Sequence, residues 1–89
     1  MRFEWDDDKR EANLAKHRLD LFDAINLFDG RPVHTYPSQR GDERRFVTVG
    51  LITGVFVAAI WTERGDAVRL ISLRRARDGE KRAYRARHG

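Results

Sequence analysis

Residues 45–62 read RFVTVGLITGVFVAAIWT, and this stretch decides the fold class. β-Branched and aromatic residues dominate both halves, from Arg45 to Ile52 and from Val55 to Thr62, which is typical of two strands. Only Thr53-Gly54 separates the halves, and a two-residue connection that ends in glycine favours a tight hairpin. The sequence therefore predicts an antiparallel pair at the centre of the protein.

Segments on both sides extend this pair into a sheet. Glu63 to Asp66 predicts a second turn, and Ala67 to Arg74 predicts a third strand, so the three form a meander. Phe3 to Trp5 and Val33 to Tyr36 are short strand candidates. Pro37 and the polar residues that follow it, up to Asp42, predict a loop.

Helices are expected before and after the sheet. The acidic triplet at 6–8 opens a helix that runs to about His17, because carboxylates in the first turn offset the positive end of the helix dipole. Asp20 caps a second helix over Leu21 to Phe28, and Asp78-Gly79 opens a last one. We expect an α+β fold: a small antiparallel sheet of three to four strands, with two N-terminal helices on one face and a C-terminal helix. A chain of 89 residues has room for one such domain, residues 1–89.

Several classes of protein are disfavoured by composition and motifs. There is no cysteine, which fits a reducing compartment. The acidic start has no apolar export signal, and the most apolar segment, Val49 to Trp61, is shorter than the roughly 20 residues that cross a bilayer. HExxH, Walker and GxSxG motifs are missing, so we expect no metal and no cofactor. The expectation is a soluble cytoplasmic protein without membrane contact.

Positive charge is concentrated in the last third of the chain. Arg64 to Gly89 has nine Lys and Arg against three Asp and Glu, hence +6, whereas Met1 to Glu63 has nine against eleven, hence −2. Guanidinium groups offer paired donors that match phosphate oxygens. This distribution favours a polyanionic partner.

Alternation along Ala67 to Arg74 assigns side chains to the two faces of that strand. One face receives Val68, Leu70, Ser72 and Arg74, and the other receives Arg69, Ile71, Leu73 and Arg75. A mid-strand Arg69 needs an anion, and the alternatives are a phosphate or a carboxylate from Glu63, Glu80 or a helix-1 aspartate. Arg69 and Arg74 can serve one phosphate only if a bulge or a twist near Ser72 turns one of them.

The first helix gathers polar groups on one face. At about 100° per residue, an amine, an amide, an imidazole and a second amine lie close together, from Lys9, Asn13, His17 and Lys16. Imidazole suits proton transfer near neutral pH. The plain alternative is a solvated helix surface without chemistry.

Motifs spread along almost the whole chain resemble the BrnT family of type II toxins. They are Phe3-Glu4-Trp5-Asp6, Lys9, Asn13, Lys16-His17, Ala24, Phe28, Glu43-Arg44-Arg45, Thr48-Val49-Gly50, Arg64-Gly65-Asp66, Arg69 to Arg74, Glu80, Arg82 and Tyr84. The resemblance implies a RelE-like fold and a ribonuclease toxin that stops translation. It also implies a BrnA-type antitoxin as partner, with promoter DNA bound only through the antitoxin complex.

From the chemistry of RNA we expect metal-independent cleavage, in which the 2′-OH attacks the adjacent phosphate. The catalytic candidates, for proton transfer and for binding and orienting the phosphate, are Lys9, His17, Arg64, Arg69, Ser72 and Arg74. The RNA-binding candidates are Asn13, Lys16, Arg44, Arg75, Arg82 and Tyr84. Either Lys9 or His17 could act as the base.

Two other readings fit the same residues. A basic domain can bind nucleic acid or an acidic partner without catalysis, or serve as a co-repressor subunit. The apolar hairpin residues Phe46, Phe56 and Trp61 are expected to form core, with a homodimer contact as the other use of an exposed part.

Overall fold

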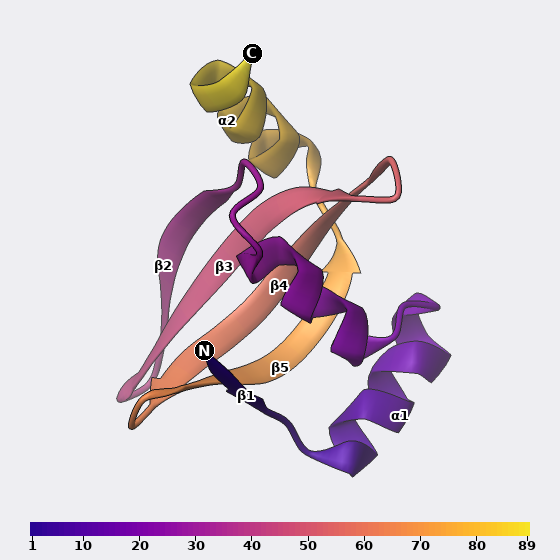
Figure 1. The fold of residues 1–89 in the computed structure, drawn as a ribbon, viewed down its shortest axis with the longest axis vertical. Coiled ribbons are helices and arrows are strands. Elements are labelled where there is room, and N and C mark those ends of the chain that lie inside the picture. Colours follow the sequence, from indigo (N-terminus) through magenta and orange to yellow (C-terminus); the bar gives the residue numbers. More distant parts are fainter.

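A five-stranded mixed sheet flanked by three helices forms the protein, as the computed structural model of residues 1–89 shows (Figure 1). The elements in chain order are β1 (Arg2–Glu4), α1 (Asp7–His17), the 3₁₀-helix η1 (Leu21–Phe28), β2 (His34–Arg40), β3 (Glu43–Ile52), β4 (Val55–Arg64), β5 (Ala67–Arg75) and α2 (Asp78–His88). The strand order across the sheet is β1-β5-β4-β3-β2. β1 runs parallel to β5, and every other neighbouring pair is antiparallel.

The prediction of an antiparallel sheet with three to four strands was therefore wrong, although the α+β class holds. β1 joins the sheet from the far end of the sequence, beside the last strand, and local pattern cannot reveal such a distant pairing. The segment after Pro37 is strand rather than loop, since β2 continues to Arg40. β2 lies at the edge of the sheet, where the missing N–H of a proline need not interrupt the hydrogen bonds between strands.

The predicted hairpin is confirmed and has its expected turn. Thr53 and Gly54 both have positive φ, at 50° and 77°, as a tight two-residue hairpin connection requires. The second predicted turn is also present, because β5 follows β4 after only Gly65 and Asp66.

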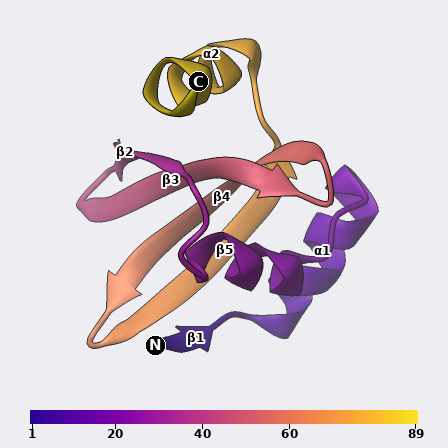
Figure 2. The same ribbon diagram turned by 45° about the horizontal axis from the view of Figure 1, so that its top comes forward.

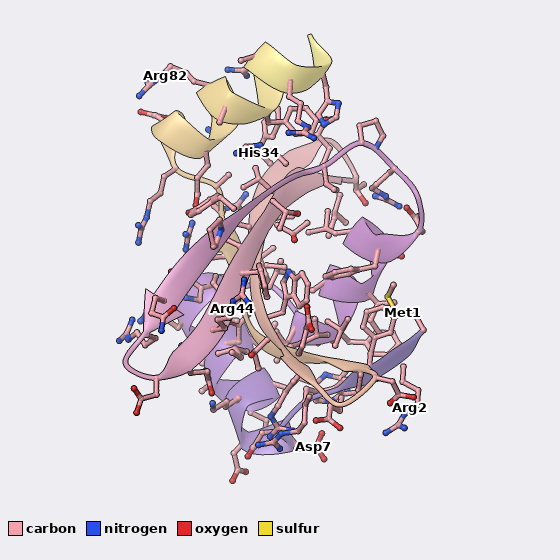
Figure 3. The ribbon with its side chains drawn as sticks, turned by 90° about the vertical axis from the view of Figure 1, so that its left-hand side faces the viewer. Met1, Arg2, Asp7, His34, Arg44 and Arg82 are labelled. Atoms are coloured by element: carbon pink, nitrogen blue, oxygen red, sulfur yellow. The ribbon has the colours of Figure 1, made fainter.

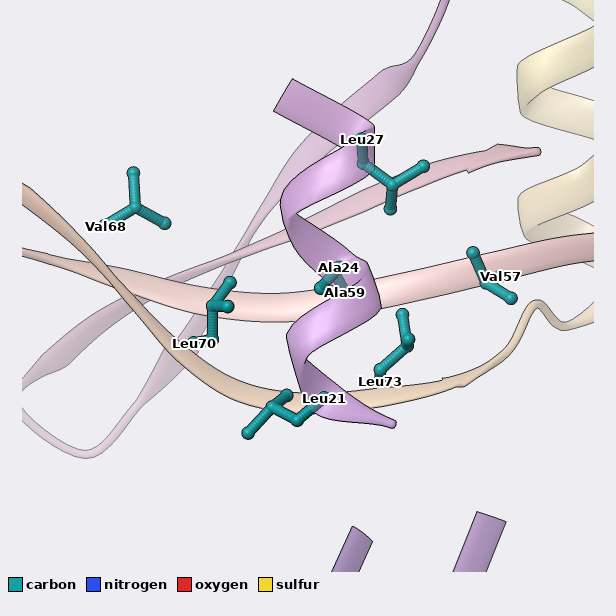
Figure 4. Close-up of a cluster of buried hydrophobic side chains, with 8 residues drawn as sticks. All are labelled: Leu21, Ala24, Leu27, Val57, Ala59, Val68, Leu70 and Leu73. Carbon is teal, nitrogen blue, oxygen red and sulfur yellow. The ribbon is translucent and has the colours of Figure 1, made fainter. Parts of the chain in front are cut away.

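The main core lies between η1 and one face of the sheet (Figure 4). Leu21, Ala24 and Leu27 of η1 are at most 2% exposed and pack against side chains of β4 and β5. Their spacing of three residues matches the three residues per turn of a 3₁₀-helix. The predicted bounds of this helix are confirmed, and its buried residues form one stripe along it.

The helices do not all lie where they were expected. α2 packs on the sheet face opposite η1, against a smaller cluster formed by Val47, Val49, Ala58 and Ala76 (Figure 2). α1 lies alongside β5, beyond the point where β1 ends. The face opposite η1 is thus covered by α2 at one end and left open at the other.

A β-bulge in β5 changes which residues share a face. Ile60 pairs with Ser72 but the next residue, Trp61, pairs with Leu70, so Ile71 is an extra residue in β5. As a result Leu70 and Leu73, three residues apart, both enter the main core. The simple alternation predicted for this strand is wrong after Ile71, and Arg69 and Arg74 lie on the same face.

α1 begins and ends with clear capping features. The Asp6 carboxylate accepts hydrogen bonds from the backbone N–H groups of Asp8 and Lys9, at 2.8 and 3.3 Å. At the other end Arg18 adopts the left-handed conformation, with φ 58° and ψ 28°. A side chain is disfavoured there, because Cβ approaches the following carbonyl.

We expect Arg18→Gly to raise the free energy of unfolding by about 0.5–1 kcal/mol, since glycine adopts this conformation without strain. Urea unfolding monitored by circular dichroism would measure the gain. Ala15→Gly, at an exposed helical position in α1, is the matched control and should lower stability by about 1 kcal/mol. Equal losses in both variants would contradict the prediction.

Candidate functional site

The open part of the sheet face opposite η1 forms a basic groove between α1 and β2. Its volume is about 380 Å³ and it contains no acidic side chain. We call it the groove, and its polar lining residues are Lys16, His17, Tyr36, Ser38, Arg40, Arg45, Ser72, Arg74 and Arg77. Five of these are Lys or Arg, so the groove suits an anionic ligand.

Strand register places these residues side by side. Tyr36, Val47, Ile60 and Ser72 are successive partners across β2, β3, β4 and β5, so they form one row on the groove face. The neighbouring row runs through Ser38, Arg45, Thr62 and Arg69. α1 adds Lys16 and His17 from the side of β5.

His17 is the group best suited to proton transfer in the groove. Burial lowers the pKa of its imidazole, and the positive charges of Lys16 and Arg74 lower the pKa further. The imidazole is therefore neutral at neutral pH and able to accept a proton.

A buried carboxylate fixes one wall of the groove. Glu80 is 7% exposed and accepts two hydrogen bonds from the Arg74 guanidinium, at 2.8 and 2.9 Å. It also accepts from the backbone N–H of Arg77 at 2.7 Å and from the hydroxyl of Tyr36. Arg74 is thus held in a bidentate ion pair and has fewer donors left for a ligand.

The ion pair between Glu80 and Arg74 makes the stability of the fold depend on pH. Burial by itself would raise the pKa of Glu80, but the hydrogen bonds from Arg74, Arg77 and Tyr36 outweigh it and lower the pKa to about 2. A carboxyl with a lowered pKa stabilises the fold above its ordinary pKa near 4.5, and this contribution is lost as the pH falls towards 2. The difference corresponds to about 3 kcal/mol.

We therefore expect Glu80→Gln to flatten the loss of stability between pH 5 and pH 2.5, while lowering stability at pH 7 because Arg74 loses its counter-charge. Urea unfolding at several pH values would test this. Glu63→Gln, at an exposed carboxylate without an ion pair, should keep the wild-type slope. A Glu80→Gln variant with an unchanged slope would contradict the assignment.

Asn13 joins α1 to β5. Its side-chain nitrogen donates to the carbonyls of Leu19 and Leu73, both at 2.9 Å. Its side-chain oxygen accepts from the Leu73 N–H and the Ser72 hydroxyl, both at 3.0 Å. Asn13 is 6% exposed and its amide has no hydrogen-bonding group left for a ligand, so the structure gives it a structural role in place of the predicted contact with RNA.

A second hollow adjoins the groove. It has a volume of about 430 Å³ and shares Arg45 and Ile71 with the groove. We call it the second hollow; its lining residues are Lys9, Glu43, Arg44, Arg45, Thr62, Glu63, Arg64, Arg69 and Ile71. A smaller depression on α1, which includes Lys9, Lys16 and His17, connects the two regions.

Glu4 of β1 organises the second hollow. Its carboxylate lies 3.3 Å from the nearest Arg69 nitrogen and 3.9 Å from the Arg64 Nε. Glu4 is also the register partner of Arg69 in the parallel pair. The predicted carboxylate partners of Arg69 were different residues, because the placement of β1 beside β5 was unknown.

Comparison with known families decides the identity of the chain. Residues 5–80 match the family described as ribonuclease toxin, BrnT, of type II toxin-antitoxin system. The chain belongs to the BrnT family. The predicted resemblance is confirmed, and with it the class of activity, a ribonuclease toxin that works with an antitoxin and has RNA as its substrate. No curated protein sequence matches the chain.

The structure of this BrnT family member brings together most of the predicted site residues. Lys16, His17, Ser72 and Arg74 line the groove, and Lys9, Arg44, Arg64 and Arg69 line the second hollow. Four line neither region: Asn13, whose contacts are described above, and three others, Arg75, Arg82 and Tyr84.

Those three lie elsewhere for different reasons. Arg75 pairs with the core residue Val57, which puts it on the face opposite the groove. Arg82 is exposed on α2, far from Arg44 in Figure 3. Tyr84 packs edge-on against Phe56, with ring centroids 5.2 Å apart.

Sequence reasoning missed five lining residues of the groove, namely Tyr36, Ser38, Arg40, Arg45 and Arg77. The first three alternate along β2, and this period of two was the available signal. It was overlooked because Pro37 was taken to end the strand.

No group of three His, Asp or Glu side chains is arranged to hold a metal ion. None of the helices is long and apolar enough to span a membrane.

Proposed function

We propose that this toxin is a metal-independent endoribonuclease that cleaves RNA in the groove and so inhibits translation in the cytoplasm. The observation that carries the proposal is the place of the His17 imidazole in a groove that is lined by five Lys and Arg side chains and by no acidic one. The lowered pKa of His17 suits it to accept a proton. A base and a concentrated positive charge are what cleavage by the RNA's own 2′-OH requires.

In the proposed reaction, His17 accepts the proton of the 2′-OH, whose oxygen attacks the adjacent phosphorus. The bond from phosphorus to the 5′-oxygen breaks, and that oxygen takes a proton from a water molecule, which receives in turn the proton held by His17. The products are a 2′,3′-cyclic phosphate and a 5′-hydroxyl. Lys16, Arg40 and Arg45 stabilise the additional negative charge on the phosphate oxygens.

The test is incubation of the purified toxin with a defined RNA oligonucleotide in excess EDTA, followed by analysis of the ends. Cyclic-phosphate ends support the proposal, and a requirement for added Mg²⁺ overturns the mechanism. Tight RNA binding without cleavage would instead favour the binding-module or co-repressor reading.

We also propose that the partner is a BrnA-type antitoxin that covers the groove with acidic residues, and that the complex contacts promoter DNA through the antitoxin. Support comes from the charge of the groove, since complementary charge favours masking by an acidic segment. Co-expression of the antitoxin should relieve the growth arrest that the toxin causes, and the antitoxin and RNA should compete for the free toxin.

A homodimer formed through the hairpin stays a prediction.

A further inference from the structure

The second hollow has the charge of an anion site but, unlike the groove, has no imidazole for proton transfer. Five of its lining residues are basic and two are acidic. One of the acids, Glu43, is already paired with Arg45, whose hydrogen bond lowers the pKa of Glu43. No histidine lines this hollow, and the Thr62 hydroxyl donates to the Arg44 carbonyl at 2.7 Å. These groups can bind an anion but are poorly equipped to cleave one.

Glu4 holds Arg69 in the second hollow and lies near Arg64 before a ligand arrives. Glu4 lies close to both Arg64 and Arg69, which lowers the repulsion between the two guanidinium groups. Arg64 nevertheless keeps a side chain that is 66% exposed, so part of its guanidinium is open to solvent. Arg69 is thus ordered in advance and can contact a phosphate with little loss of side-chain entropy, while Arg64 offers free donors.

The second hollow and the groove are spaced for one extended strand. Arg45 borders both, and Arg69 lies on the same row two strands away, which is about 10 Å at the usual strand spacing. A continuous row of positive side chains can follow the phosphate backbone of a single-stranded nucleic acid. A strand whose reacting phosphate lies near His17 can therefore place a flanking phosphate near Arg64.

We propose that the second hollow is a phosphate subsite for an RNA nucleotide next to the cleaved bond. This inference rests on the proposed function and moves Arg64 and Arg69 from catalysis to substrate binding. The subsite makes the toxin prefer substrates with several phosphates over a dinucleoside monophosphate, which has only one.

Binding is measured with two probes that cannot be cleaved, a 2′-O-methyl hexanucleotide and a 2′-O-methyl dinucleoside monophosphate. Wild-type toxin should bind the hexanucleotide more tightly, and Arg64→Ala should reduce this preference about tenfold. The slope of log K against log salt for the hexanucleotide should also fall by about 0.7, the value for one phosphate contact on a single strand. Arg87→Ala, which removes an exposed charge from α2 outside both hollows, should leave the preference unchanged.

A wild-type toxin without length preference, or equal effects of Arg64→Ala and Arg87→Ala, would overturn the subsite. Cleavage is followed in parallel with a hexanucleotide that carries a single ribonucleotide. If the binding pattern holds and this substrate is not cut in EDTA, the proposed function fails while the subsite stands. If it is cut and the binding pattern is missing, only the subsite fails.

Discussion

Replacing Asn13 by aspartate is expected to lower the free energy of unfolding by about 3–5 kcal/mol. The carboxylate keeps the two acceptor contacts but loses both donated hydrogen bonds, and it faces the carbonyl oxygens of Leu19 and Leu73. Burial leaves its charge without a partner. For a domain whose whole stability is about 5–15 kcal/mol, this is a large part of the total.

Chemical denaturation at pH 7 would measure the loss, with Asn26→Asp as the matched control. Asn26 is exposed and makes one side-chain hydrogen bond, to the Asp23 carbonyl at 3.1 Å, so its replacement should change stability by no more than about 0.5 kcal/mol. Burial raises the pKa of the introduced carboxyl, so the deficit relative to wild type should narrow as the pH falls. A loss at Asn13 no larger than the loss at Asn26 would refute this role.

The importance of Asn13 follows from the edge of β5. β1 covers the first part of that edge, and where β1 ends the Asn13 amide takes over, with the donor and acceptor pattern of a backbone peptide. The helical face was predicted from sequence. Asn13 lies inward and the lysines of α1 lie outward because β5 packs beside this helix. The periodicity of the helix cannot predict where β5 lies.

The sheet shows which parts of a fold are readable locally. The hairpin around Thr53-Gly54 was predictable because its strands and turn are adjacent in sequence. The parallel pairing of β1 with β5 joins residues more than sixty positions apart, and no turn signal marks it. Pro37 misled the prediction of β2, since only the edge position makes proline acceptable there.

The sequence predicted which types of residue form the candidate site, but not which of them lie together. The charge pattern indicated arginines for phosphate, but the bulge at Ile71 decides that Arg69 and Arg74 share a face. Arg74 is held by Glu80 through two hydrogen bonds, at 2.8 and 2.9 Å, whereas Arg69 makes a single contact with Glu4 at 3.3 Å. Arginines that look equivalent in sequence therefore differ in how freely they can meet a ligand.

His17→Ala is expected to slow RNA cleavage roughly 100- to 10,000-fold, the usual contribution of a general base. Because the pKa of His17 is lowered, the acid limb of the kcat/KM profile should lie below the ordinary imidazole value of 6.5. Removing the Lys16 charge in Lys16→Ala raises the pKa of His17, so this limb should move to higher pH. A purely structural role for His17 would not produce that movement.

The matched control is His88→Ala, because His88 is exposed on α2 and its ring contacts the Val33 carbonyl rather than the groove. It should keep the wild-type rate and the wild-type pH profile. If His17→Ala retains more than about a tenth of the activity, general-base catalysis by this imidazole is ruled out, since that loss is well below the usual range. Lys9, which lines the depression shared with His17, would then be the next residue to test for proton transfer.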